Sequence, residues 1–301
     1  MSAVAIPILP AIRLKNILYA TDFSEASRAA LPILATIARK YGSHVFAAHV
    51  WAPQPYTMVS REELALLDGK EESDAREVLE SFVRIKELEG ISVTPLVTCG
   101  DAARELGRMV RQKHIDLAIL STHGRTGFKR LLLGSVAEEL FRRLPCPVLT
   151  VGPHISSRFA TQTEVSEVLF PTDLSIESGG VFPYLASLAS ESAAHMTLLH
   201  VVPGEDRRHP SAIDEHDSLR SAMQRMFCPK IDPRCEVKLV VEAGDPVEQI
   251  LAHSRADKAD LIGFGVRKAG EISTHVRNSV PYKVVLEAEC PVLTSHLSGG
   301  W

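Results

Sequence analysis

The 301-residue chain has few cysteines and no long apolar run. Its five cysteines form no CxxC pair, so neither a disulfide framework nor a zinc site of that spacing is expected. No apolar run approaches the roughly 20 residues of a membrane helix. Residues 1–12 have no basic stretch before their apolar ones, so no signal peptide is predicted. The composition favours a cytoplasmic protein that makes no use of a membrane.

The chain also lacks a large excess of positive or negative charge. The chain has 33 Lys and Arg against 37 Asp and Glu residues, a net charge of −4, so no nucleic-acid partner is predicted. It lacks a Walker A motif, a GxGxxG fingerprint and a GxSxG elbow. Its twelve histidines show no HxxxH or Cys/His zinc spacing. We therefore predict no catalytic residues and no metal held by protein ligands.

What the chain does have is an internal repeat. The segments 17–24 (ILYATDFS) and 168–175 (VLFPTDLS) match at an offset of 151, as do His49-Val50 and His200-Val201. Three later pairs match at an offset of 144: Gly100-Asp101 with Gly244-Asp245, Asp116-Leu117 with Asp260-Leu261, and CPVLT at 146–150 with CPVLT at 290–294. Several matches in one order indicate a duplicated domain. We expect domains at 1–153 and 164–301, joined by the polar linker 153–164.

Each copy alternates short apolar strands with amphipathic helices. In the first copy, strands are expected at 17–21, 44–51, 91–97, 117–121 and 147–151. One helix is expected from the N-cap Ser24 to Gly42, and a long acid-rich helix over 62–89. This order predicts an α/β fold: two tandem doubly wound, Rossmann-like domains, each a five-stranded parallel sheet flanked by helices.

In such sheets, ligands bind beyond the carboxyl ends of the strands, where the strand order reverses. Two segments of the first copy are expected there. The first is Thr21-Asp22-Phe23-Ser24 and the second is the glycine-containing loop 121–135. Such a loop can present successive backbone N–H groups to a phosphate, and the helix that begins near Ser135 adds its positive end.

These residues resemble the universal stress protein family, here in tandem. The resemblance rests on the TDFS-type strand end, the G-x2-G-x9-G-[ST] loop and the closing CPVL strand, and it covers nearly the whole chain. It implies an ATP-binding site, with Mg²⁺ bound through the ATP phosphates. Carried over, it makes Asp22 and Val50 adenine contacts and assigns ribose and phosphate to the loop and the helix start: Ser121, His123, Gly124, Gly134, Ser135 and Val136. Ser121 departs from the family pattern, which has glycine there.

The second copy departs further from the pattern. Asp173 and Val201 are retained, and Gly265 stands at the first glycine position. Lys268 and Asn278 replace the next two glycines. Bulky side chains would obstruct a backbone cradle, although Lys268 and Arg267 could neutralise a phosphate directly. We expect the first copy to bind nucleotide and the second mainly to support it.

Structural interpretations of the same residues stay open. Ser135 and Glu138 form a capping box without any ligand, and Asp22 could cap the turn after Phe23. His49 and His200 are interpreted as packed, hydrogen-bonded strand residues, and Cys146 and Cys290 as buried ones.

The sequence favours a cytoplasmic, ATP-binding stress-response protein in which nucleotide occupancy acts as a switch or store. A nucleotide-free interaction scaffold and a slow ATPase are the alternatives. The resemblance further implies that the last strands of the two copies, at 147–151 and 291–294, pair to form an internal pseudo-dimer, which would cover their edges. A homodimer of the whole chain is also favoured.

Overall fold

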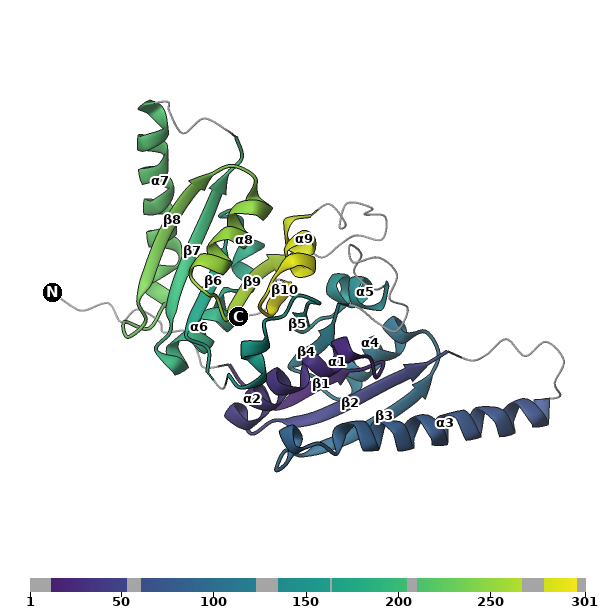
Figure 1. Ribbon diagram of the computed structural model, residues 1–301. Helices are drawn as coiled ribbons and strands as arrows, with labels where there is room; N and C mark the ends of the chain where they lie inside the picture. The colour runs from purple at the N-terminus through teal and green to yellow at the C-terminus, as the bar shows by residue number, and fades with distance from the viewer. Residues whose placement is uncertain are drawn as a thin grey trace. The chain divides into compact units, whose positions relative to one another are not determined.

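The computed structural model describes residues 12–52, 61–122, 135–162, 164–204, 210–266 and 279–296 (Figure 1). The chain divides into two compact units. The N-terminal unit comprises Arg13–Pro153 and Ser157–Gln162. Ile12, His154–Ser156 and the described residues from 164 onward belong to the C-terminal unit.

The N-terminal unit is built on a parallel sheet with the strand order β3-β2-β1-β4-β5. The central strands carry near-continuous buried apolar residues, as expected of a sheet covered on both faces. The strands are β1 (Asn16–Ala20), β2 (His44–Trp51), β3 (Val93–Cys99), β4 (Leu117–Ser121) and β5 (Val148–Val151).

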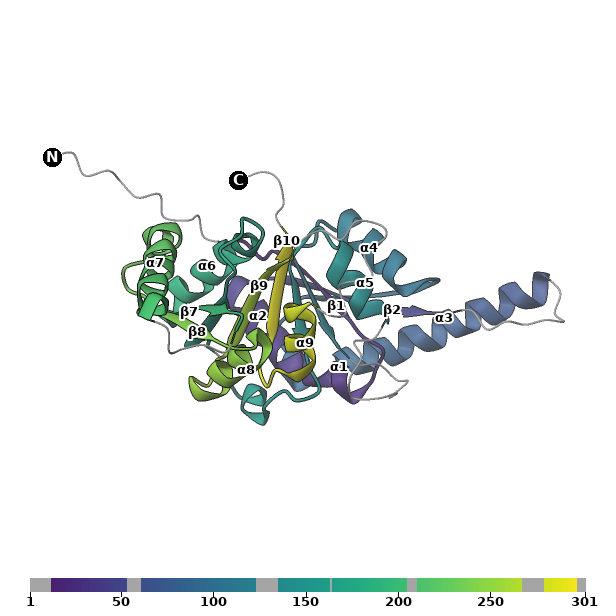
Figure 2. The same ribbon diagram turned by 90° about the horizontal axis from the view of Figure 1, so that it is seen from above.

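Helices cover both faces of this sheet. In Figure 2, α1, α2 and α3 lie on one face, and α4 and α5 lie on the other. Among the helices that the structure describes, in either unit, none is both long and apolar enough to cross a membrane. The helical elements of the N-terminal unit are α1 (Glu25–Ala29), α2 (Leu31–Tyr41), α3 (Arg61–Val83), η1 (Lys86–Leu88), α4 (Ala102–Gln112), α5 (Ser135–Arg143) and η2 (Ser157–Ala160).

The C-terminal unit repeats the plan with the order β8-β7-β6-β9-β10, again parallel. Here α6 and α7 lie on one face and α8 and α9 on the other (Figure 2). The predicted fold class is confirmed. The elements are β6 (Glu167–Pro171), η3 (Ser178–Gly180), α6 (Phe182–Ser192), β7 (His195–Val202), α7 (Pro210–Met226), η4 (Cys228–Lys230), β8 (Val237–Ala243), α8 (Pro246–Ala256), β9 (Leu261–Val266), α9 (Val280–Glu287) and β10 (Val292–His296).

The single helix expected between Ser24 and Gly42 is in fact two helices. Ser24 caps α1 by accepting the N–H of Ser27, but α1 ends at Ala29 and α2 begins at Leu31. The cause is Pro32 in the first turn of α2, because proline lacks an N–H and its ring clashes with the preceding helical turn. Gly42 ends α2 in the left-handed conformation, as predicted.

The acid-rich helix expected over 62–89 is also shorter than predicted. It ends at Val83, and the chain continues into η1. The guanidinium of Arg39 donates to the carbonyl oxygens of Glu87 and Glu89, and Leu88 is buried. These contacts come from another helix, so the local pattern could not reveal them.

Several repeated residues have a structural role in both units. Asp116 Oδ2 accepts the N–H groups of Lys15 and Asn16 at 2.8 and 2.9 Å, just ahead of β1. Asp260 Oδ2 does the same for Ser166 and Glu167 at 2.7 and 3.0 Å, at the start of β6. These contacts account for the repeated aspartates without any ligand.

Two further repeated Asp residues begin helices, as predicted. Asp101 accepts the N–H of Arg104 and caps α4, and Asp245 accepts two N–H groups at the start of α8. The glycine ahead of each cap has a φ near +139°, a conformation in which other residues are strained (Gly100 and Gly244).

His195, at the start of β7, is a pH-sensitive group on the surface. Its Nδ1 lies 2.6 Å from Glu167 Oε1, and this hydrogen bond raises the pKa of His195 above 6.5. The small stabilisation is therefore complete below pH 6.5 and lost as the pH rises through the folded-state pKa. We expect an NMR titration of His195 to give a pKa above 6.5 and the Glu167→Gln variant to bring it back toward that value. An unshifted pKa in the unmodified chain would contradict the ion pair.

Candidate functional site

The candidate site of the N-terminal unit lies at the carboxyl ends of β1 and β4. The strand order reverses between these two strands, since β1 continues to β2 on one side and pairs with β4 on the other. Asp22 follows the end of β1, and Ser121 is the last residue of β4. Two segments about 100 residues apart in the sequence thus meet at one edge of the sheet.

Asp22 is held in place by a cluster of hydrogen bonds. Its Oδ1 accepts the N–H of Ser24 at 3.1 Å and the hydroxyls of Ser24 and Ser27, both at 2.6 Å. Hydrogen bonds to an ionised acceptor are shorter and stronger than those between neutral groups. The carboxylate is therefore fixed at the strand end, and the turn-forming role left open for Asp22 is present in this geometry.

Ser27 connects Asp22 to the second segment. Its Oγ also lies 3.5 Å from Ser121 Oγ, and its carbonyl oxygen accepts the hydroxyl of Tyr19 at 2.7 Å. Burial raises the pKa of that tyrosine, which remains a neutral donor. Ser27 was not among the predicted site residues. The signal was present in the repeat, because Ser27 aligns with Ser178 at the same offset as the flanking segment.

The turn after Asp22 is conformationally strained. Phe23 has a φ of +67°, and the equivalent Leu174 has +61°. A left-handed conformation costs a non-glycine residue about 1–2 kcal/mol. The centroid of the Phe23 ring lies 4.2 Å from that of the His49 ring and 5.5 Å from that of the Phe82 ring. This packing holds the turn in place. Strained turns of this kind persist where surrounding contacts hold them, and they are frequent at ligand sites.

His49 has the structural role that was predicted for it. The side chain is buried, and its Nδ1 donates to the carbonyl oxygen of Thr21 at 2.8 Å. His200 makes the same bond to Thr172 at 2.8 Å in the C-terminal unit. Val50 follows His49 at the carboxyl end of β2, half-buried, and pairs in register with Thr98 of β3. Its contact with adenine stays a prediction.

The remaining predicted residues are only partly within the described chain. His123, Gly124 and Gly134 lie outside it. Ser135 is the first residue of α5, and Val136 is half-buried in the first turn of that helix. The capping box depends on the side chain of Ser135, which also lies outside the described part.

The equivalent strand end of the C-terminal unit is arranged differently. Asp173 Oδ1 accepts the N–H and the hydroxyl of Ser175 at 3.0 and 2.5 Å. Burial acts to raise the pKa of Asp173, but the hydrogen bonds from Ser175 outweigh it and lower that pKa. Ser178, the equivalent of Ser27, contacts Thr172 Oγ1 at 2.8 Å and the carbonyl oxygen of Ser175 at 2.9 Å.

Gly265 is needed for packing in the C-terminal unit. It stands where the N-terminal unit has Ser121, at the first glycine position of the loop pattern. A Cβ at this position would overlap the carbonyl oxygen of Glu177 and lie 2.5 Å from that of Ser178. The backbone leading into η3 therefore occupies the space of a side chain. A structural requirement accounts for this glycine without a phosphate.

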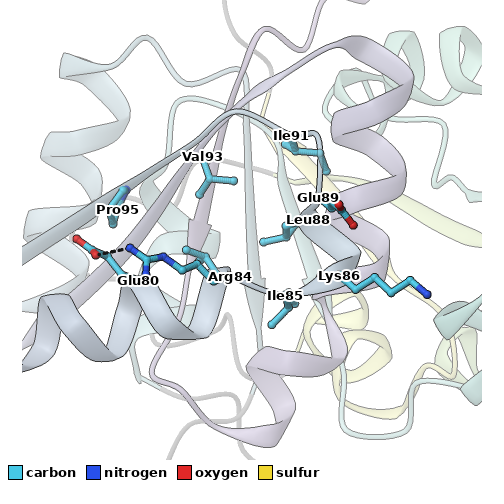
Figure 3. Close-up of a pocket in the computed structure, with 10 residues that line it drawn as sticks. Glu80, Arg84, Ile85, Lys86, Leu88, Glu89, Ile91, Val93 and Pro95 are labelled. Atoms are coloured by element: carbon cyan, nitrogen blue, oxygen red, sulfur yellow. Dashed lines mark hydrogen bonds and ion pairs between the residues drawn. The ribbon is translucent and has the colours of Figure 1, made fainter.

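A groove of about 650 Å³ lies elsewhere on the N-terminal unit (Figure 3). It is formed by the last turn of α3, by η1 and by Val93 and Pro95. Figure 3 shows Glu80 and Arg84 pointing toward each other, 3.1 Å apart, while Lys86 extends away. Val93 and Pro95 belong to the amino-terminal half of β3. The groove is thus at the wrong end of the strand to be part of the site around Asp22.

The groups around Asp22 can recognise a hydrogen-bond donor of a ligand. The carboxylate can accept a hydrogen bond from a ligand N–H, and Ser121 adds a hydroxyl at the end of β4. Within the described ranges, no group of three or more His, Cys, Asp or Glu side chains could hold a metal ion. Cys146 is buried, which raises the pKa of its thiol to about 12 and makes it a poor nucleophile.

Comparisons with known proteins identify relatives along the whole chain. The model of the Universal stress protein family matches residues 13–152 and 165–296. Universal stress protein MJ0531 of Methanocaldococcus jannaschii is 30% identical over 138 residues, covering 46% of this chain and 81% of that protein. Universal stress protein Slr1230 of Synechocystis is 25% identical over 303 residues, covering 93% of this chain and 99% of that protein.

A solved structure has the same fold over both units. The crystal structure of a universal stress protein from Archaeoglobus fulgidus covers 95% of this chain and 100% of its own, with a TM-score of 0.63 and 20% identity. The family model matches two consecutive segments of this chain, and both units have the same strand order. The chain therefore belongs to the universal stress protein family, as a tandem of two family domains.

Proposed function

We propose that the N-terminal unit binds ATP and that its occupancy serves as a switch or store in a stress response. The observation that carries the proposal is the fixed carboxylate of Asp22, connected through Ser27 to Ser121 at the point where the strand order reverses. A carboxylate at this edge is placed to accept an N–H of a purine ring system.

The rest of the proposed site follows the family resemblance. Val50 completes the adenine contact through the end of β2. Ser121, His123, Gly124, Gly134, Ser135 and Val136 hold ribose and phosphates at the start of α5, where free backbone N–H groups favour an anion. Mg²⁺ would bind through the phosphates, because the described residues supply no metal cluster. We place the protein in the cytoplasm.

We propose that the protein acts through whether ATP is bound, and that it does not hydrolyse ATP rapidly. A general base must reach the attacking water with a free acceptor. Asp22, the carboxylate that follows β1, already accepts three donors through Oδ1, and we assign it to recognition of adenine. Phosphate release from the bound ATP is therefore expected to be slow.

Isothermal titration of the full chain with ATP, with and without Mg²⁺, tests this function. We expect saturable binding with one ATP per chain, and slow phosphate release in the same samples. Extraction and mass identification of any co-purified nucleotide give an independent stoichiometry. No saturable ATP binding in either condition would overturn the proposal and favour an interaction scaffold.

A further inference from the structure

The sheet of the C-terminal unit ends at β8, whose outer edge is unpaired within the described part of the chain. In Figure 1, β8 lies beside β7 at the end of this sheet. It is the opposite end from β10, the strand that the family resemblance pairs with the first copy. The backbone groups of an unpaired strand edge are a template for another strand.

The register with β7 fixes which backbone groups of β8 point outward. The N–H of Met196 donates to the carbonyl oxygen of Glu236, and the N–H of Gly244 donates to that of Val202. Because backbone groups alternate in direction along a strand, the even-numbered residues of β8 turn theirs toward β7. The outward N–H and C=O groups belong to the odd-numbered residues Val237, Leu239, Val241 and Ala243.

The first copy blocks the same edge with a proline. Its end strand β3 pairs with β2 in the equivalent register, since the N–H of Val45 donates to the carbonyl oxygen of Ser92. Pro95 therefore stands at an outward-facing position, where it offers no N–H and hinders the approach of another strand. Leu239 occupies this position in the second copy, at the offset of 144. The edge of β8 thus keeps a donor that the edge of β3 lacks.

The sequence of β8 is complementary to itself in an antiparallel pair. We consider two β8 strands from two molecules, related by a twofold axis at Val240. Lys238 of one molecule then lies opposite Glu242 of the other, and Leu239 lies opposite Val241. The odd-numbered residues exchange about eight backbone hydrogen bonds, and the charged residues take the positions where facing side chains come closest. Opposite charges that face each other across two strands stabilise the pair.

Neighbouring registers lose this complementarity. With the axis at Leu239, Glu242 would face Glu236 of the other molecule, and like charges in that arrangement are destabilising. With the axis at Val241, Glu242 would face Val240. The charges therefore select the register about Val240.

Both charged side chains lie on the face of the sheet that α8 covers. Lys238 Nζ is 3.4 Å from Asp257 Oδ1, and Glu242 Oε1 is 3.6 Å from His253 Nε2. Residues opposite one another in an antiparallel pair share a face, so the two charges of different molecules lie together. The side chain of Lys238 is 58% exposed, which leaves its ammonium accessible to a second carboxylate beside Asp257.

We propose that the outer edge of β8 is an interface between two molecules of this protein. The two β8 strands pair antiparallel about a twofold axis at Val240, and the sheet of the C-terminal unit continues from one molecule into the other. The Lys238–Glu242 pairs fix the register, while the backbone hydrogen bonds and the apolar pairs hold the strands together. Exposed ion pairs contribute little and the edge is short, so the dimer is weak and forms as the protein concentration rises. The interface does not involve the proposed ATP site.

Sedimentation velocity of the full chain over a range of concentrations tests the interface. We expect a monomer–dimer equilibrium that Leu239→Pro weakens by about tenfold, because each molecule loses one edge donor. The fold tolerates proline here in the first copy, as Pro95 shows. Val93→Pro, at an outward-facing position of β3, is the matched control and should leave the dimer unchanged. A dimer that Leu239→Pro does not weaken would overturn the proposal, and a chain that stays monomeric would overturn it in favour of a strand from another protein.

Charge reversals test the register. Lys238→Glu and Glu242→Lys each place like charges opposite one another, and each should weaken the dimer by about tenfold. An equimolar mixture of the two variants restores opposite charges between unlike molecules, so it should associate about as well as the unmodified chain. Circular dichroism and urea unfolding establish that each variant is folded. A mixture of folded variants that associates no better than either variant alone would contradict the antiparallel pairing.

Discussion

Replacing Asp22 by alanine is expected to weaken ATP binding by the N-terminal unit about 10- to 100-fold. Hydrogen bonds to a charged group contribute about 1.5–3 kcal/mol each, and the variant removes the one carboxylate of the strand end. It also removes the acceptor for the hydroxyls of Ser24 and Ser27, so the turn loses its fixed geometry. Isothermal titration of the purified variant measures the affinity.

Asp116→Ala is the matched control for this variant. Asp116 belongs to the same unit and also accepts hydrogen bonds with one oxygen, but at the amino end of β1. We expect it to lower the free energy of unfolding to a similar extent, measured by urea denaturation, and to leave ATP affinity unchanged. Equal affinity in the Asp22→Ala variant and the unmodified chain would show that Asp22 serves only the turn.

The second large effect is expected at Gly265. Its replacement by alanine should destabilise the C-terminal unit by about 3 kcal/mol, since the new methyl group would overlap backbone atoms of Glu177 and Ser178. Backbone cannot rotate away as a flexible side chain can, so η3 must shift. Urea unfolding followed by circular dichroism measures the loss.

Two other glycines of the same unit provide graded controls. A methyl group on Gly263 would overlap the side chain of Leu185, which can partly repack, so a smaller destabilisation is expected. Gly179 has no atom within 4 Å of an added methyl group, and its alanine variant should be near neutral. If Gly265→Ala were as stable as Gly179→Ala, the close approach of η3 to β9 would be wrong.

Local patterns predicted most of the fold correctly. The strands expected in the first copy correspond to β1–β5 within a few residues, because buried parallel strands have short apolar runs bounded by caps and glycines. The errors occur where distant contacts compete with local preference. One example is the end of α3, where Arg39 binds carbonyl groups of the following turn.

The candidate site was also predictable only where local patterns indicate it. Asp22 and Ser121 were predicted as site residues because they end apolar strands, which is a local signal, and the structure brings these two strand ends together. Ser27 was missed because its role depends on its position between these two residues, and Ser121 is 94 positions away in the sequence. The phosphate-loop residues His123, Gly124 and Gly134 stay predictions, as does the pairing of the two copies.

The sequence by itself determined the duplication, the alternation of strands and helices, and the polar residues that end the strands. All of these depend on spacing along the chain. Only the tertiary structure decided which repeated residues serve the fold. Asp116 and Asp260 hold the segments that lead into β1 and β6, and Gly265 makes room for the backbone ahead of η3. The residues that these three contact lie between 87 and 101 positions away in the sequence, so only packing brings each pair together. These contacts show a structural role that spacing along the chain could not distinguish from ligand binding.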